Sequence, residues 1–211
     1  INLKELIYSA TAAKAANSLN KKNCGLSDFL NLISPAAEPY LVKMGQRANS
    51  IKLRRFGKTI KLYAPLYVSN KCRNSCVYCG FNAKNIVKRI TLTYEQIETE
   101  ARQLKDYGFD NILIVAGDAA DVSIEYLRET VKLLKKYFSY IGIEVAPLEE
   151  NQYADLVSAG LDGLTTFQET YNREIYRASH PTGSKKNYDY RLKTLERGAA
   201  AGVKDLGFGV L

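Results

Sequence analysis

The chain has 211 residues, of which 46% are hydrophobic, so it can bury a core as one domain or as part of one. It contains no signal peptide and no apolar run long enough to span a membrane, which argues against a membrane protein and predicts no membrane partner. Three of its four cysteines lie within eight positions of one another, which argues against a disulfide framework. A reducing cytoplasm fits this composition best.

The net charge of +8 is spread unevenly along the chain. Residues 1–90 hold 16 Lys or Arg against 3 Asp or Glu, a balance of +13, and residues 91–211 hold 14 against 19, a balance of −5. A basic first segment is compatible with a nucleic-acid surface. Attraction of an acidic electron donor or partner, or solvated helix faces, is the favoured explanation of the charge, because no aromatic-interleaved platform or nucleic-acid motif accompanies it.

The first sixty residues predict helices. Residues 3–17 carry apolar side chains at helical spacing, and residues 26–32 form a short apolar stretch. Ser34 followed by Pro35 is a helix start signal, with Glu38 suited to the positive end of the helix dipole. We therefore expect a helical N-terminal extension over residues 1–58.

From residue 59 onward, strand and helix signals alternate. Short apolar runs predict strands at 60–68, 111–116, 141–146, 163–167 and 205–210. Capping residues and terminal glycines predict helices between them, at 93–108, 123–137, 149–159 and 188–201. Such alternation without a hairpin signal predicts an α/β fold with right-handed βαβ units and a parallel sheet over residues 59–211.

Cys72, Cys76 and Cys79 form a Cys-x3-Cys-x2-Cys run directly after the first expected strand. Three thiolates can hold three irons of a 4Fe-4S cubane and leave the fourth iron open. Alternatives are a zinc site with the lone His180 as fourth ligand, or buried structural thiols. Zinc sites usually pair cysteines from two knuckles, and this chain has no second knuckle, so the cluster is favoured.

The cysteine spacing, with the aromatic Tyr78 just before the last cysteine, resembles the cluster loop of the radical S-adenosylmethionine (SAM) family. The resemblance implies a TIM-type (β/α) barrel, a 4Fe-4S cluster and SAM, whose amino and carboxylate groups chelate the open iron. Transfer of one electron to SAM would then cleave the sulfonium to methionine and a 5′-deoxyadenosyl radical. About five βα units are covered, so we expect this chain to be part of a longer protein whose remainder carries further active-site residues.

In parallel α/β barrels the chemistry collects at the carboxyl ends of the strands. Gly117 and Asp118 end the second expected strand and resemble the family's Gly-Gly-Glu segment, which holds the SAM amino group; a loop cap is the alternative for Asp118. Glu144 lies in an apolar strand, where a carboxylate is costly unless it faces the barrel mouth or meets a cation.

Three more polar residues are candidates near the later strands. By resemblance to the radical SAM family, Gln168 would bind the SAM ribose and Arg191 the SAM carboxylate, with a strand-end or salt-bridge role as the alternative for each. His180 stands beside a proline and could be a proton-transfer group, a zinc ligand or a turn residue. Cys24 is expected to be a thiol without a role in the cluster.

Longer segments resemble one branch of the family, the tyrosine lyases of thiamine biosynthesis. They include Ser34-Pro-Ala-Ala37, Arg55-Phe-Gly-Lys-Thr-Ile60, Phe167-Gln-Glu-Thr-Tyr171 and Tyr188-x-x-Arg191. The resemblance implies cleavage of the Cα–Cβ bond of L-tyrosine to p-cresol and dehydroglycine, delivery of dehydroglycine to thiazole synthase, and a flavodoxin or ferredoxin-type reductant. Rivals are the tyrosine lyase of FeFe-hydrogenase maturation, a radical SAM enzyme acting on RNA, and a cluster-bearing scaffold without catalysis.

Overall fold

The computed structural model describes residues 2–211 and divides them into two compact units, with the boundary between Ile60 and Lys61. The sequence places this boundary two residues earlier, between residues 58 and 59. Each unit is described by itself below.

The N-terminal unit is helical throughout. Its elements are α1 (Leu3–Tyr8), α2 (Ala12–Asn20), α3 (Leu26–Leu32), the 3₁₀ helix η1 (Pro35–Tyr40) and α4 (Leu41–Phe56). The single helix expected over residues 3–17 is wrong, because Thr11 has extended backbone and its hydroxyl accepts a hydrogen bond from the Lys14 amide, which starts a new helix. The start signal at Ser34 opens a 3₁₀ helix, and the α-helix begins seven residues after Ser34, at Leu41.

Asp28 is the polar centre of the N-terminal unit. Its carboxylate accepts hydrogen bonds from the Lys21 ammonium at 2.7 Å, the Ser18 hydroxyl at 2.8 Å and the Gly25 amide at 3.1 Å. These contacts tie α2 to the start of α3. The Lys21 hydrogen bond, followed by those from Gly25 and Ser18, lowers the pKa of Asp28 to about 2.

Acid should therefore loosen this unit. The ionised carboxylate is the bonded form, so its contribution to stability is complete above the ordinary pKa of 3.8 and is lost as the pH falls through about 2. Carboxyl NMR should report the lowered pKa, and amide exchange in α2 and α3 should rise over the same interval. Asp28→Asn should show faster exchange already at neutral pH, whereas Glu38→Gln should not. An Asp28 pKa near 3.8 would contradict this assignment.

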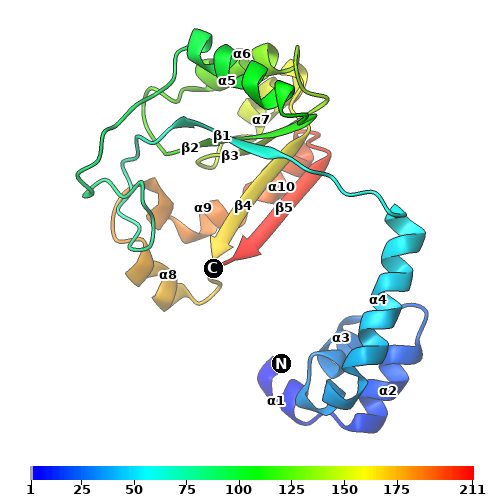
Figure 1. The fold of residues 1–211 in the computed structure, drawn as a ribbon. Helices are drawn as coiled ribbons and strands as arrows, with labels where there is room; N and C mark the ends of the chain where they lie inside the picture. The colour runs from blue at the N-terminus through cyan, green and yellow to red at the C-terminus, as the bar shows by residue number, and fades with distance from the viewer. Residues whose placement is uncertain (1) are drawn as a thin grey trace. The chain divides into compact units, whose positions relative to one another are not determined.

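The second unit is built on one parallel sheet. Its strands lie in the order β1-β2-β3-β4-β5, and every neighbouring pair is parallel. They are β1 (Ala64–Ser69), β2 (Asn111–Ala116), β3 (Tyr140–Glu144), β4 (Gly163–Glu169) and β5 (Asp205–Val210). Figure 1 shows the strands running toward the same side of the unit, where the loops after β1 and β4 gather. The predicted α/β class is confirmed.

Helices connect successive strands. They are α5 (Tyr94–Asp106), α6 (Ile124–Leu134), α7 (Glu150–Ala159), α8 (Arg173–Ser179), the 3₁₀ turn η2 (Ser184–Lys186), α9 (Tyr188–Leu192) and α10 (Thr194–Ala200). Figure 1 shows α5, α6 and α7 covering one face of β1–β3. The helix predicted over residues 188–201 is two helices that meet at Lys193, and α8 was not predicted.

The core lies between the sheet and these helices. Ile112 and Ile114 of β2 pack with Leu127 of α6 and Leu156 of α7, all at most 1% exposed.

Strand β1 starts at residue 64 rather than at residue 60 as predicted, because its pairing with β2 begins at Ala64. Within residues 2–211, none of the helices combines the length and apolar character needed to cross a membrane.

Candidate functional site

The loop after β1 carries the three clustered cysteines. Cys76 is buried, whereas Cys72 and Cys79 are partly exposed. The Asn74 side-chain amide lies 3.5 Å from the Cys72 sulfur, and the Phe81 amide donates to the Cys79 sulfur at 3.4 Å. Hydrogen bonds of this kind to cysteine sulfurs are typical of iron–sulfur sites. We refer to residues 70–83 as the cluster loop.

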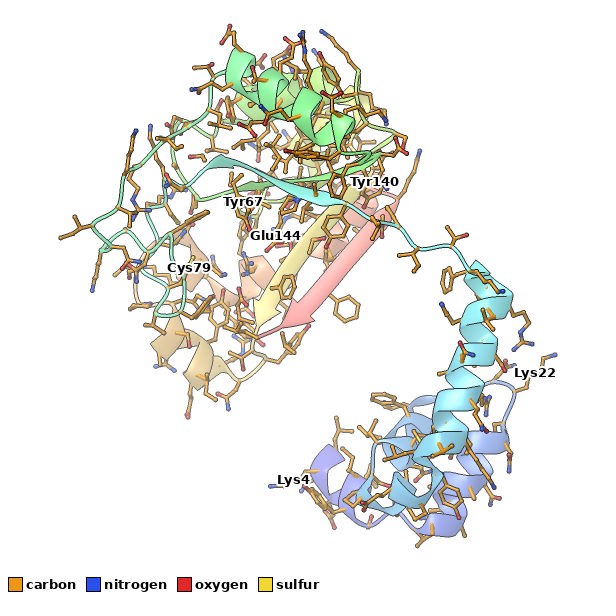
Figure 2. The ribbon with its side chains drawn as sticks, viewed as in Figure 1. Lys4, Lys22, Tyr67, Cys79, Tyr140 and Glu144 are labelled. Carbon is orange, nitrogen blue, oxygen red and sulfur yellow. The ribbon has the colours of Figure 1, made fainter. Side chains whose placement is uncertain are left out.

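A cavity of about 390 Å³ lies beside the cluster loop, at the carboxyl ends of the strands. Figure 2 shows Glu144 and Tyr67 on the side of the sheet that faces the loop bearing Cys79. The volume is within the range of small-molecule sites. Its wall contains seven of the nine predicted site residues: Cys72, Cys76, Cys79, Gly117, Asp118, Glu144 and Arg191.

Gly117 brings the end of β2 against the cluster loop. Its amide donates to the Ser69 carbonyl at 3.1 Å, and a Cβ at this position would stand 2.1 Å from the Lys71 carbonyl oxygen and 3.0 Å from the Cys72 Cβ. Only glycine allows this approach. Gly117 therefore sets the distance between the strand end and the first cysteine.

Asp118 anchors the cluster loop. Arg73 approaches Oδ1 at 2.9 Å, while Asn74 at 3.0 Å and the Ser184 hydroxyl donate to Oδ2. Burial raises the pKa of this carboxyl, but the hydrogen bonds from Arg73, Ser184 and Asn74 outweigh it and hold the pKa below its ordinary value. A carboxylate has about four acceptor positions, so three donors leave room for about one more.

Beside the remaining acceptor position of Asp118, two other charged groups in the wall, Glu144 and Arg191, have unused bonding capacity. Within residues 2–211, no hydrogen bond or ion pair reaches the Glu144 carboxylate; burial raises its pKa, and the positive charges of Arg191 and Lys185 oppose that rise. Arg191 is 8% exposed and donates Nε–H to the Phe167 carbonyl at 2.8 Å. Its two terminal amino groups have no hydrogen-bond partner among the described residues.

Two predicted contacts, Tyr78 and Gln168, are not part of the cavity wall. The Tyr78 hydroxyl is hydrogen-bonded to His180, and burial raises the phenol pKa. Gln168 is 4% exposed and shares the strand face of Leu164, which packs toward α10. Its amide nitrogen lies 3.5 Å from the Tyr188 carbonyl, and its carbonyl oxygen is buried without a partner.

Both ring nitrogens of His180 are hydrogen-bonded within the protein. It is 1% exposed; Nε2 shares a hydrogen bond with the Tyr78 hydroxyl at 2.5 Å, and Nδ1 lies 2.7 Å from the Tyr176 carbonyl. A zinc ligand needs one free nitrogen, which these contacts do not leave. Among residues 2–211, no three His, Cys, Asp or Glu side chains are arranged to hold a single metal ion.

Sequence reasoning missed a buried ion pair beside the cysteines. Lys185 lines the cavity and meets Glu169 at 2.6 Å, with only 17% and 11% of the two side chains exposed. Glu169 has φ of 71°, an uncommon value for a residue other than glycine, and lies at the register shift between β4 and β5. Lys185 is followed by Lys186, so the sequence offers only an ordinary surface charge run as its signal.

The cavity thus joins three cysteines, a glycine backbone approach and two unsatisfied opposite charges at the carboxyl edge of a parallel sheet. Residues 66–211 match the model of the radical SAM superfamily. The chain belongs to the radical SAM superfamily. The fold class expected from the cysteine loop and the alternating elements is therefore confirmed.

One curated relative and two solved structures illustrate the match. The chain is 40% identical over 97% of its length to 2-iminoacetate synthase of Escherichia coli strain K12, covering 55% of that protein. It superposes with a TM-score of 0.92 and 31% identity on 99% of its length with HydG, a maturase of the [FeFe]-hydrogenase, covering 48% of that chain. Methylornithine synthase shares the fold with a TM-score of 0.71 and 22% identity. The chain spans about half the length of these relatives.

The radical SAM family implies a 4Fe-4S cluster and SAM, and the residues present fit both groups. Three cysteines of one loop face a common cavity, the donor set that such a cluster uses. The Glu144 carboxylate and the unpartnered terminal amino groups of Arg191 lie in the same wall and complement an ammonium and a carboxylate, the two charges of an amino acid.

Proposed function

We propose that this chain is the cluster- and SAM-binding part of an enzyme that cleaves the Cα–Cβ bond of L-tyrosine to give p-cresol and 2-iminoacetate. The observation that carries the proposal is the single cavity that holds the three cysteines, Glu144 and Arg191. The 40% identity to 2-iminoacetate synthase across nearly the whole chain supports tyrosine as substrate.

The roles of the residues follow from their chemistry. Cys72, Cys76 and Cys79 would hold the cluster, and Arg191 would pair its free amino groups with the SAM carboxylate. Glu144, as the carboxylate without a protein partner, and Asp118, with its remaining acceptor position, would receive the SAM ammonium. When bound, the cluster and SAM supply the radical that abstracts hydrogen from the substrate.

Two of the remaining predicted contacts stay part of this proposal. Gly117 would let the backbone approach the cofactor, as it already lets β2 approach the cluster loop, and Tyr78 would pack beside the cofactor. Gln168 is not assigned to the ribose, because it lies on the helix-facing side of β4 and outside the cavity wall. The buried pair of Lys185 and Glu169 is neutral as a unit, so it adds polarity to the wall without net charge.

The proposed partners follow from the tyrosine-lyase assignment. 2-Iminoacetate hydrolyses readily, so direct delivery to thiazole synthase would protect it, and a flavodoxin or ferredoxin-type protein would provide electrons in the cytoplasm. One rival function has a specific observation in its favour. The TM-score of 0.92 with HydG supports a tyrosine lyase of hydrogenase maturation, in which dehydroglycine is processed further.

Product analysis separates these functions. The full-length protein, given SAM, a low-potential reductant and L-tyrosine, should release p-cresol and 5′-deoxyadenosine, with glyoxylate from hydrolysis of 2-iminoacetate. Cyanide and carbon monoxide should stay near background. Stoichiometric cyanide with p-cresol would favour the hydrogenase-maturation function instead. SAM cleavage that RNA stimulates and tyrosine does not affect would exclude both tyrosine lyases.

A further inference from the structure

Residues 179–185, which run from the last residue of α8 into η2, lie along the cluster loop although they are remote in sequence. The Val77 amide donates to the Ser179 carbonyl at 3.1 Å. One residue further in each segment, the Tyr78 hydroxyl shares its hydrogen bond with His180, 102 positions away. A backbone contact and a side-chain contact therefore join two consecutive residues of the cluster loop to two consecutive residues of the other segment.

The contacts continue at the start of the cluster loop. The Ser75 and Thr182 hydroxyls lie 2.6 Å apart. The Lys185 amide donates to the Asn74 side-chain oxygen at 2.8 Å. Gly183 lies between these two contacts with φ of +88°, and a Cβ there would stand 2.1 Å from the same Asn74 oxygen. The close approach therefore requires glycine at this position.

Two buried side chains, His180 and Asn74, take part in the hydrogen bonds between these two segments. His180 uses one ring nitrogen for Tyr78 and the other for the carbonyl of its own helix. Asn74 is 4% exposed; its oxygen accepts from the Lys185 amide at 2.8 Å, and its amide faces Asp118 at 3.0 Å and the Cys72 sulfur at 3.5 Å. Both ring nitrogens of His180 and both amide protons of Asn74 are therefore directed at other parts of the protein.

We propose that residues 179–185 form a clasp that fixes the cluster loop in its cysteine-presenting conformation before any cluster is bound, with Asn74 and His180 as positioning residues. Ordering an irregular loop costs conformational entropy at every residue, so contacts made beforehand reduce what metal binding must supply. Support of this kind is what keeps binding side chains in a productive geometry. The purpose assigned to the clasp rests on the proposed cluster-binding function, but its existence is measurable without a cluster.

The sharpest test compares two glycine variants in the iron-free chain by hydrogen–deuterium exchange. Gly183→Ala adds a Cβ against Asn74, whereas Gly108→Ala adds one at nearly the same backbone angle, φ of +89°, with nothing within 4 Å. Both variants carry the strain of a positive φ, and only the first breaks the clasp. We expect exchange in residues 72–79 to rise at least about tenfold in Gly183→Ala and to stay unchanged in Gly108→Ala.

A second pair of variants tests a single hydrogen bond of the clasp. Thr182→Val removes the bond to Ser75, and Thr99→Val is the matched change on the exposed face of α5. Thr182→Val should speed exchange of the cluster loop about fivefold, the worth of one hydrogen bond, with an unchanged melting temperature. After reconstitution it should also lose iron to a chelator faster than Thr99→Val.

Conservative rescue separates positioning by His180 from simple packing. His180→Gln keeps a polar group toward Tyr78, and His180→Phe keeps only bulk, so the loop should exchange more slowly in the first. Equal loop exchange in the two glycine variants, or in the two threonine variants, would overturn the clasp. Failure of the unaltered chain to bind iron would instead contradict the proposed function and leave the exchange results standing.

Discussion

Replacing Cys72, Cys76 or Cys79 by Ala should abolish the 4Fe-4S cluster. Three thiolates are the minimum that holds a cubane with one open iron, so each loss leaves two irons without a protein ligand. Anaerobic reconstitution of the unaltered chain should give about four irons and four sulfides per chain, and each variant should fall to background. Burial raises the pKa of the Cys76 thiol, while the positive charge of Lys185 favours the thiolate that the cluster needs.

Cys24→Ala is the matched control. Cys24 is an exposed thiol in the N-terminal unit and lies outside the cavity wall. This variant should keep full iron and sulfide content. Stoichiometric zinc without sulfide in anaerobically prepared protein, lost in the three loop variants, would show that the cysteines form a different metal site.

Arg191→Ala should weaken SAM binding by about 1.5–3 kcal/mol, which is roughly ten- to 150-fold. The guanidinium is buried at the cavity wall, and its terminal amino groups are available for a carboxylate. The SAM affinity of Arg191→Lys should fall between those of the unaltered chain and Arg191→Ala, because an ammonium keeps the charge but loses the fork geometry. Equilibrium binding of SAM to the cluster-loaded chain measures both effects.

Arg102→Ala controls for the loss of an arginine, since Arg102 lies on the exposed surface of α5 and pairs with Glu98. Its SAM affinity should match that of the unaltered chain. The cluster spectrum should survive in every arginine variant. If a folded, cluster-loaded Arg191→Ala protein binds SAM normally, Arg191 serves only to hold α9 against the Phe167 carbonyl.

Much of the fold could be predicted because local signals agreed with the tertiary structure. Strands at residues 111–116 and 205–210 were predicted with the bounds that the structure shows, since apolar and β-branched runs between helices have few alternatives. The helix after Thr93 followed from its capping box, which the structure contains. The gathering of Gly117, Asp118 and Glu144 around one cavity could be predicted because parallel strands deliver their carboxyl ends to one edge.

Other features depend on contacts that the sequence does not reveal. Strands of a parallel sheet are buried on both faces, so the pattern of β4 could not show that Gln168 faces the helices. Lys185 looks like a solvent charge until its partner Glu169 is brought to it by the fold. The contacts of His180 and Asn74 join segments about a hundred residues apart, a relation that no local pattern encodes.

The most direct test of the central claim is the electron paramagnetic resonance spectrum of the reduced chain, recorded before and after addition of SAM. Three cysteines in one wall of a cavity, with Glu144 and Arg191 in the same wall, predict a 4Fe-4S signal that SAM alters, because SAM would bind the open iron. A missing cluster signal, or a cluster signal that saturating SAM leaves unchanged, would contradict the account.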